Sequence, residues 1–381
     1  QAGGVIRPDI SPLELHWHIS ALSFFNVSNR PSFGLSFGND LFEEPGQARL
    51  REQAVQSLLR LVMPSTAFPS TEPMMIDPDL TPFLTLWGEK WAALPQGSGP
   101  AERRAMFERI AAEMRLPTPE AVETDAEHWI ESSAGPVRVR VFRHASGGVQ
   151  PCLVYMHGGA WMQGSPETHW DITARLAAEN RMTVISVDYA LAPEHPFPAA
   201  LDQCGAVVRW VQGKAAELGV DPARLSVGGD SAGGNLAAAL ALDLRGEVPL
   251  VAQLLIYPAC DFDLTRPSMI ENAEAPLLQT RGMDVVNAMY CPDSANLTNP
   301  RVAPLHAGSH AGLPPAFIAV AQNDPLRDSG LVYAEALRAA GVPVTLDHGE
   351  GLIHGYLRAM PWCAASRERL TAMAGWLGER R

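Results

Sequence analysis

The sequence predicts an α/β fold, in which an eight-stranded, mostly parallel sheet is flanked by helices. From about Glu127 onward, short β-rich runs alternate with helical stretches, a pattern typical of such a sheet. Of the 381 residues, 46% are hydrophobic, so the chain can bury a large core. It exceeds one ordinary α/β domain by roughly a hundred residues. We therefore expect a main domain over residues 127–381 and an extension with appended helices over residues 1–126.

The strand pattern defines the predicted sheet. The first two strands are separated by five residues, too few for a crossover helix, so they should pair antiparallel at one edge. The eight expected strands are Glu127–Glu131, Val137–Phe142, Cys152–Met156, Thr183–Asp188, Leu225–Gly229, Ala252–Tyr257, Ala316–Ala321 and Val344–Asp347.

Segments with the helical spacing of apolar residues lie between the later strands, and further such segments precede the first strand. Proline-rich connectors separate the early helical patterns, which suggests appended helices. The expected helices are Gln47–Val62, Pro82–Ala93, Ala101–Arg115, Trp170–Asn180, Ala200–Leu218, Ala232–Leu244 and Val332–Ala340. Apolar residues at every second position of Leu13–Ile19 predict an isolated strand, which would join a sheet edge or a second subunit in a homodimer.

Composition excludes several classes of partner. A formal net charge of −13 leaves no broad basic surface for nucleic acid. The sequence contains no run of eighteen apolar residues, so no membrane span is expected, and no export signal is recognisable. The five cysteines form no C-x-x-C pair and favour a reducing, cytoplasmic compartment. His16 and His18 lack a third ligand at suitable spacing, so neither a metal nor a cofactor is expected.

The segment Val227–Asn235 carries the strongest functional signal. It follows an apolar strand, precedes an alanine-rich helix and contains the pattern G-x-S-x-G around Ser231. In a strand-to-helix turn this tight, the residues two before and two after the serine must be very small, and Gly229 and Gly233 occupy both places. Ser231 should therefore stand exposed above the sheet edge as a nucleophile, provided that a base, an acid and an oxyanion hole lie elsewhere.

A second glycine-rich turn follows the strand that ends at Met156. Its residues His157-Gly158-Gly159-Ala160-Trp161 leave backbone amides unobstructed, as an oxyanion hole requires. The amide of Ala232, directly after the proposed nucleophile, should complete the hole.

The acid and the base should follow later strands. Asp324 lies at the end of a strand, whereas the alternative, Asp328, falls where a helix begins. His354 lies in a loop from which its ring can reach over the sheet edge, whereas the alternative, His348, sits at a strand end. We prefer Asp324 and His354, which gives the chain order Ser, Asp, His.

Four sequence blocks together resemble the bacterial hormone-sensitive-lipase-like family of esterases, in its Gly-Asp-Ser-Ala-Gly subgroup. The resemblance extends from about Met75 to the C-terminus and implies an α/β-hydrolase fold with a helical cap, built from the N-terminal segment and an insertion at Phe262–Pro300. The blocks are His157-Gly158-Gly159-Ala160, Tyr189-Ala190-Leu191-Ala192-Pro193-Glu194-His195-Pro196, Gly229-Asp230-Ser231-Ala232-Gly233-Gly234-Asn235, and Asp324-Pro325-Leu326 with His354-Gly355.

The resemblance also implies roles for individual residues. Ser231 would attack an ester carbonyl, His354 would act as base and then acid, and Asp324 would orient the histidine. The oxyanion hole would consist of Gly159, Ala160 and Ala232 amides, with Gly158 shaping the turn.

Two residues depart from the family pattern. Ala160 replaces a usual glycine, and we expect its φ to be negative. Ala190 replaces a usual arginine, which should loosen its loop. Three residues are candidates for the substrate pocket: Trp161, His157 and Asp230. The alternative for Trp161 is packing under the cap, and the alternative for Asp230 is a structural role as a hydrogen-bond acceptor.

The sequence therefore predicts a serine carboxylesterase that hydrolyses short- to medium-chain esters through an acyl-enzyme intermediate, a chain length that the resemblance implies. One alternative is a lactonase or amidase with the same triad. Another is a ligand-binding protein without catalysis on this fold, which retention of His354 makes the last choice.

Overall fold

The computed structural model describes residues 75–95, 97–124 and 126–380. Residues Met75–Arg381 form one compact unit. The predicted strand Leu13–Ile19 and helix Gln47–Val62 lie outside the described residues.

The described part of the chain forms a nine-stranded sheet in the order β1-β3-β5-β4-β6-β7-β8-β9, with β2 also paired to β3. Strands β4 to β9 run parallel, whereas β3 is antiparallel to β5, and both β1 and β2 are antiparallel to β3. All eight predicted strands form, and the antiparallel edge is confirmed; β1 was not predicted. The strands are Val122–Glu123 (β1), Glu127–Ile130 (β2), Val137–His144 (β3), Gln150–Met156 (β4), Thr183–Asp188 (β5), Val220–Asp230 (β6), Leu250–Ile256 (β7), Ala316–Ala319 (β8) and Val344–Asp347 (β9).

Helices cover both faces of the sheet. On one face, α6 (Trp170–Asn180) and α13 (Ala364–Gly378) bury their apolar residues against the strands. The opposite face is covered by α7 (Ala199–Gly213), α9 (Ala232–Asp243) and α12 (Arg327–Ala339). The parallel strands are therefore buried on both sides, which explains why β4 reads as a nearly continuous apolar run.

Two helix predictions need correction, and one long helix was not predicted. The predicted helix Ala200–Leu218 is interrupted at Lys214, where ψ is 14°, and continues as a separate short helix, α8 (Ala215–Leu218). Helix α12 begins at Arg327, five residues before the predicted start at Val332, and directly follows a turn in which the Asp324 carboxylate accepts the Leu326 amide. Helix α13 was not among the predicted helices.

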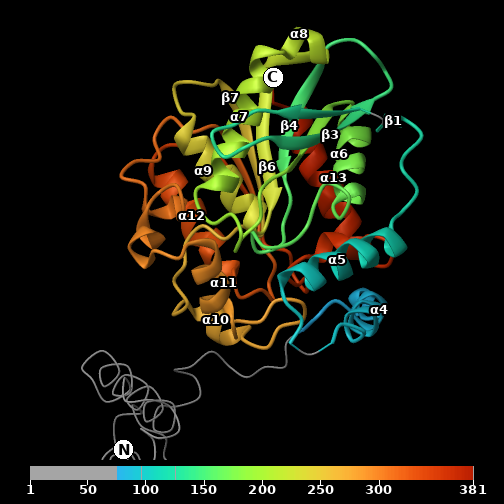
Figure 1. The fold of residues 1–381 in the computed structure, drawn as a ribbon, viewed down its shortest axis with the longest axis vertical. Helices are drawn as coiled ribbons and strands as arrows, with labels where there is room; N and C mark the ends of the chain where they lie inside the picture. The colour runs from blue at the N-terminus through green and yellow to red at the C-terminus, as the bar shows by residue number, and fades with distance from the viewer. Residues whose placement is uncertain (1–74, 96, 125, 381) are drawn as a thin grey trace, which may run out of the picture. The chain divides into compact units, whose positions relative to one another are not determined.

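Four cap helices gather at one end of the sheet, in the lower part of the coloured ribbon in Figure 1. They are α4 (Thr81–Trp91), α5 (Pro100–Met114), α10 (Pro267–Glu271) and α11 (Met283–Tyr290). The first pair matches the predicted helices Pro82–Ala93 and Ala101–Arg115, and the second pair lies within the predicted cap segment Phe262–Pro300. Phe107 of α5 packs against Trp87 and Trp91 of α4, with ring centroids 6.0 and 6.2 Å apart.

Arg104 of α5 fastens the cap to the loop that contains Ala190. Its guanidinium donates to the Ala192 carbonyl at 2.8 Å and the Met162 carbonyl at 2.6 Å, and it forms an ion pair with Glu194 at 2.6 Å. The Ala190 amide donates to the Gln203 side chain at 2.6 Å. The Arg104 guanidinium, which comes from α5, therefore offsets the loosening of the loop expected from the absence of an arginine at Ala190.

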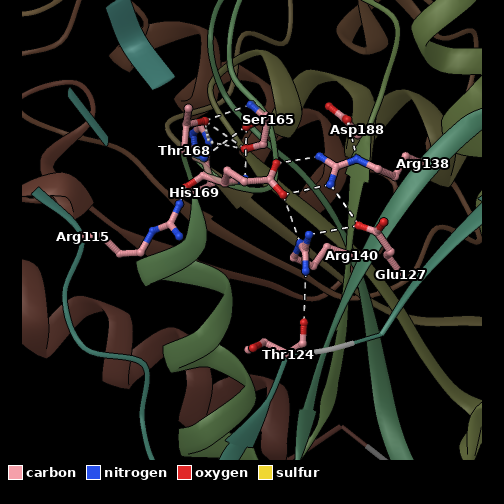
Figure 2. A network of polar contacts seen from close by, with 10 residues as sticks. Arg115, Thr124, Glu127, Arg138, Arg140, Ser165, Thr168, His169 and Asp188 are labelled. Atoms are coloured by element: carbon pink, nitrogen blue, oxygen red, sulfur yellow. Dashed lines mark hydrogen bonds and ion pairs between the residues drawn. The ribbon is translucent and has the colours of Figure 1, made fainter. Parts of the chain in front are cut away.

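A network of charged side chains joins the antiparallel edge to the loop of residues 165–169 (Figure 2). Two side chains on one face of β3 are its centre: Arg138 donates to Glu167 at 2.6 Å and to Asp188 at 2.9 Å, and Arg140 donates to Glu167 at 3.0 Å. Glu127 of β2 accepts from both arginines. Because several partners hold each charge, this network fixes the loop more firmly than an isolated surface pair would.

The network predicts a pH dependence of stability. Burial alone would raise the pKa of Glu167, but the hydrogen bond and charge of Arg138, with Arg140, lower it to about 2 from an ordinary 4.5. The stabilisation is thus present above pH 4.5 and is lost as the pH falls toward 2. Glu167→Gln should remove about 1–2 kcal/mol at pH 7 and much less at pH 2.5, measured by urea unfolding. Equal losses at both pH values would contradict this account.

Candidate active site

Ser231 lies on a sharp turn between β6 and α9. Its φ is 56°, in the left-handed region that a non-glycine residue seldom adopts. The turn approaches the end of β4 so closely that a Cβ on Gly229 would lie 2.3 Å from the Met156 carbonyl oxygen, and one on Gly233 would lie 1.9 Å from it. The two glycines of the pattern are therefore required by contact with a backbone carbonyl, as the sequence predicted.

The three predicted triad residues lie within hydrogen-bonding distance of one another. His354 Nε2 is 2.9 Å from Ser231 Oγ, and His354 Nδ1 is 2.7 Å from Asp324 Oδ2. Asp324 is fully buried, and its other oxygen accepts the Leu326 amide at 2.8 Å. The carboxylate is thus fixed on both oxygens and can orient the imidazole, an arrangement that can activate a serine hydroxyl.

A single β-bridge brings the acid and the base together. Asn323 and Ile353 pair in parallel, and the Asn323 amide donates to the Leu352 carbonyl at 2.9 Å. Because Asp324 and His354 directly follow the paired residues, their side chains emerge next to each other. The sequence contained no direct sign of this bridge.

The structure also separates the preferred residues from their alternatives. Asp328 lies in the first turn of α12, where its carboxylate accepts the Ser268 amide at 2.9 Å and pairs with Arg327. His348 is exposed to solvent. Neither makes a recorded hydrogen bond to a triad side chain within the residues described here.

The turn after β4 presents backbone amides next to Ser231. Within the described residues, the amides of Gly159, Ala160 and Ala232 have no recorded hydrogen-bond acceptor, so they are free to bind a developing oxyanion. The Gly158 amide is different, because it donates to Asp230 Oδ1 at 2.9 Å. The role of Gly158 in shaping the turn stays a prediction, and its amide does not count among the free donors.

The expectation for Ala160 is wrong. Its φ is 55° and that of Trp161 is 56°, both left-handed, and Gly159 has a φ of 132°. A Cβ on Gly159 would lie 1.9 Å from the Gln163 carbonyl oxygen, so the turn closes on itself. Two successive left-handed non-glycine residues cost on the order of 1 kcal/mol each, which the surrounding contacts must offset.

The three candidate pocket residues occupy different positions. Trp161 is 4% exposed, stacks on Tyr290 of α11 with centroids 4.2 Å apart, and lines an apolar cavity beside Ser231. Asp230 lies against the larger cavity, but its carboxylate accepts the Tyr155 hydroxyl at 2.7 Å, so it has the structural contacts of the alternative interpretation. His157 is fully buried between Tyr189 and His169 and lines neither cavity.

Two cavities meet at Ser231. The larger, of about 570 Å³, opens between the oxyanion turn and the helices α4 and α5, which contribute Trp87, Trp91 and Phe107. The smaller, of about 50 Å³, is mostly apolar and lies toward α10 and α11, with Met269 and Val286 among its lining residues. A bound ester could place its acyl and alcohol parts on opposite sides of the serine.

Sequence reasoning missed two residues beside the triad. The Tyr257 ring packs on the His354 ring with centroids 4.8 Å apart, and Arg358 lines the larger cavity. Tyr257 ends the predicted strand next to the one that leads into the Ser231 turn, so the rule that sites form at the carboxyl ends of parallel strands could have indicated it. No comparable signal marked Arg358.

Two negative findings concern the described residues. No group of three or more His, Cys, Asp and Glu side chains there is placed to hold a metal ion. None of the helices in the same residues is long and apolar enough to span a bilayer.

Residues 153–358 match the family described as "alpha/beta hydrolase fold". The chain belongs to this family. The resemblance to hormone-sensitive-lipase-like esterases is thereby confirmed. Residues 1–58 separately match the family described as "Tetracyclin repressor-like, C-terminal domain"; they lie outside the described residues.

This hydrolase is similar to proteins named as esterases. Carboxylesterase NlhH of Mycobacterium tuberculosis is 40% identical over 297 residues, covering 75% of this chain and 92% of that protein. Esterase LipI of the same species is 42% identical over 235 residues, covering 60% of this chain and 73% of that protein. The solved hyperthermophilic esterase of Pyrobaculum calidifontis aligns with a TM-score of 0.74 at 34% identity, covering 80% of this chain and 98% of that one.

The close contact at the turn between β6 and α9 predicts that one added methyl group, at Gly229, lowers both stability and activity. Gly229→Ala should displace the Met156 carbonyl, lower the free energy of unfolding by about 2–3 kcal/mol and reduce ester hydrolysis strongly. Gly213→Ala is the matched control, because a Cβ at that helical glycine meets nothing within 4 Å. Urea unfolding and hydrolysis rates check both variants. Equal behaviour of the two would contradict the close-contact interpretation.

Proposed function

We propose that this hydrolase is a serine carboxylesterase that acts through an acyl-enzyme intermediate. The observation that carries the proposal is the hydrogen-bonded series from Ser231 through His354 to Asp324, with three free amides beside the serine. The names of the similar proteins support ester hydrolysis as the reaction.

The proposed reaction proceeds in two steps. His354 takes the Ser231 proton as the oxygen attacks the ester carbonyl, and the amides of Gly159, Ala160 and Ala232 stabilise the oxyanion. His354 then gives the proton to the departing alcohol. In the second step, it activates a water that hydrolyses the acyl-enzyme, while Asp324 holds the imidazole in orientation throughout.

We also propose a preference for short- to medium-chain acyl groups. The smaller cavity suits the acyl chain, because its lining is apolar and aromatic, with Trp161 and Phe262 stacked at 5.6 Å. Its volume of about 50 Å³ limits the length that fits without rearrangement.

A first prediction concerns the nucleophile. Ser231→Ala should lower kcat for p-nitrophenyl butyrate by about 10⁴-fold or more and abolish labelling by a fluorophosphonate probe, since no nucleophile remains. A panel of matched ester, lactone and amide then ranks the esterase against the lactonase and amidase alternatives. If the wild-type protein hydrolyses none of them and takes no label, the binding-protein alternative replaces the enzyme.

A second prediction concerns chain length. Val286→Phe should fill the smaller cavity and shift the optimum on a p-nitrophenyl ester series toward shorter acyl chains. Val285→Phe is the matched control, because this neighbour on α11 is 53% exposed. The assignment of the acyl cavity fails if both variants keep the wild-type optimum, or if both shift it.

The homodimer and the cytoplasmic location remain proposals. The predicted strand that would pair two subunits lies outside the described residues. Removing residues 1–73 and measuring the mass in solution by light scattering, together with the acyl-chain preference, tests whether this segment sets assembly or substrate access.

A further inference from the structure

Asp230 connects the nucleophile turn to the oxyanion turn. It directly precedes Ser231, is 3% exposed, and accepts the Tyr155 hydroxyl at 2.7 Å and the Gly158 amide at 2.9 Å. The bond to Gly158 is the contact that turns this amide away from the site. The next two residues, Gly159 and Ala160, are then left with their amides free.

His169 shares the same amide. Its Nε2 lies 3.2 Å from the Gly158 nitrogen, so the Gly158 N–H is bifurcated between His169 and Asp230. Arg358 Nη2 lies 2.6 Å from the same Nε2. Because a guanidinium can only donate, Nε2 must be an acceptor, and the proton of the ring resides on Nδ1, which lies 2.9 Å from Thr168 Oγ1. His169 is thus neutral, in agreement with burial, which lowers its pKa.

Arg358 reaches this histidine from the loop that carries the proposed base. It lies four residues after His354, in a short 3₁₀ helix, Tyr356–Ala359. A second donor, Nη1, binds the Thr168 carbonyl at 3.0 Å. The guanidinium therefore holds two consecutive residues, Thr168 and His169, of the loop that the network in Figure 2 also contacts through Glu167.

The same guanidinium also contacts the cap. Its central carbon lies 4.6 Å from the ring centroid of Phe107 in α5 and 5.7 Å from that of Trp87 in α4. Cation–π contacts of this kind favour a fixed orientation of the cation. One side chain thus joins the cap helices, the histidine loop and, through His169, the oxyanion turn.

We propose that Arg358 and His169 are positioning residues that hold the oxyanion turn in its catalytic conformation through the shared Gly158 N–H. The inference rests on the proposed esterase function. The competing interpretation is that the pair contributes to folding alone, without influence on transition-state binding.

The decisive variant is Arg358→Met, which keeps the length of the side chain and removes both donors. It should lower kcat roughly tenfold to a hundredfold while KM stays within about threefold, because misplaced amides weaken transition-state stabilisation. Affinity for a trifluoromethyl ketone, whose hemiketal oxyanion occupies the hole, should fall by the same factor as kcat/KM. Arg358→Lys, which can make one of the two bonds, should recover part of both losses.

His169→Phe tests the second member of the pair. It keeps an aromatic ring against His157 but cannot accept from Arg358 or Gly158. It should reproduce the kinetic defect, and the double variant with Arg358→Met should be little worse than either single variant, as for residues that act as a unit. Additive losses would overturn the proposal.

Arg367→Met is the matched control. Arg367 also donates to a backbone carbonyl in the C-terminal segment, that of Met360 at 2.6 Å, but it lines neither cavity at Ser231. Its kcat should stay within about twofold of the wild type. If Arg358→Met and His169→Phe lower only the unfolding temperature and leave kcat and ketone affinity unchanged, the pair is structural and the proposal is wrong. Absence of ester hydrolysis by the wild-type protein would instead contradict the proposed function.

Discussion

The close approach of the β6–α9 turn to the Met156 carbonyl is the constraint on which the site depends. Glycine at both 229 and 233 allows the contact, because any side chain would collide with backbone. Because of this contact, His157, where the oxyanion turn begins, lies against the turn that carries Ser231. Ser231 and the free amides are thereby held together by the two central strands β4 and β6, with no need for a flexible loop to close.

The other half of the site depends on the edge of the sheet beyond β7. The Asn323–Ile353 bridge extends the pairing of β8 and β9 just far enough to bring the Asp324 and His354 loops together. The site is thus assembled from strand ends, and its rigidity is that of the sheet. Polar contacts of Asp230, His169 and Arg358 then connect these strand ends to the cap.

The sequence predicted the strands and the turns, and it singled out Ser231, Asp324 and His354, which the structure brings within hydrogen-bonding distance. Each has a local signature: alternation of strand and helix, glycines flanking a serine, or an acid after an apolar run. The expectations drawn from the sequence were wrong where a contact between distant parts of the chain determines the local conformation. The left-handed Ala160 follows from the way the turn closes on Gln163. The break at Lys214 did have a local sign in the sequence, because Gly213 ends α7 directly before it. Arg104 and Arg358 act on loops distant in sequence, so no spacing could reveal them.

The separation of Ser231 from His354 by 123 residues affects the newly synthesised protein. A chain emerging from the ribosome at roughly 5–20 residues per second exposes the serine on the order of ten seconds before the histidine exists. During that interval, the turn with its strained serine can form against β4, but no base is present to take the proton. The proposed nucleophile is therefore inert toward cellular esters until the final strand and its loop have docked.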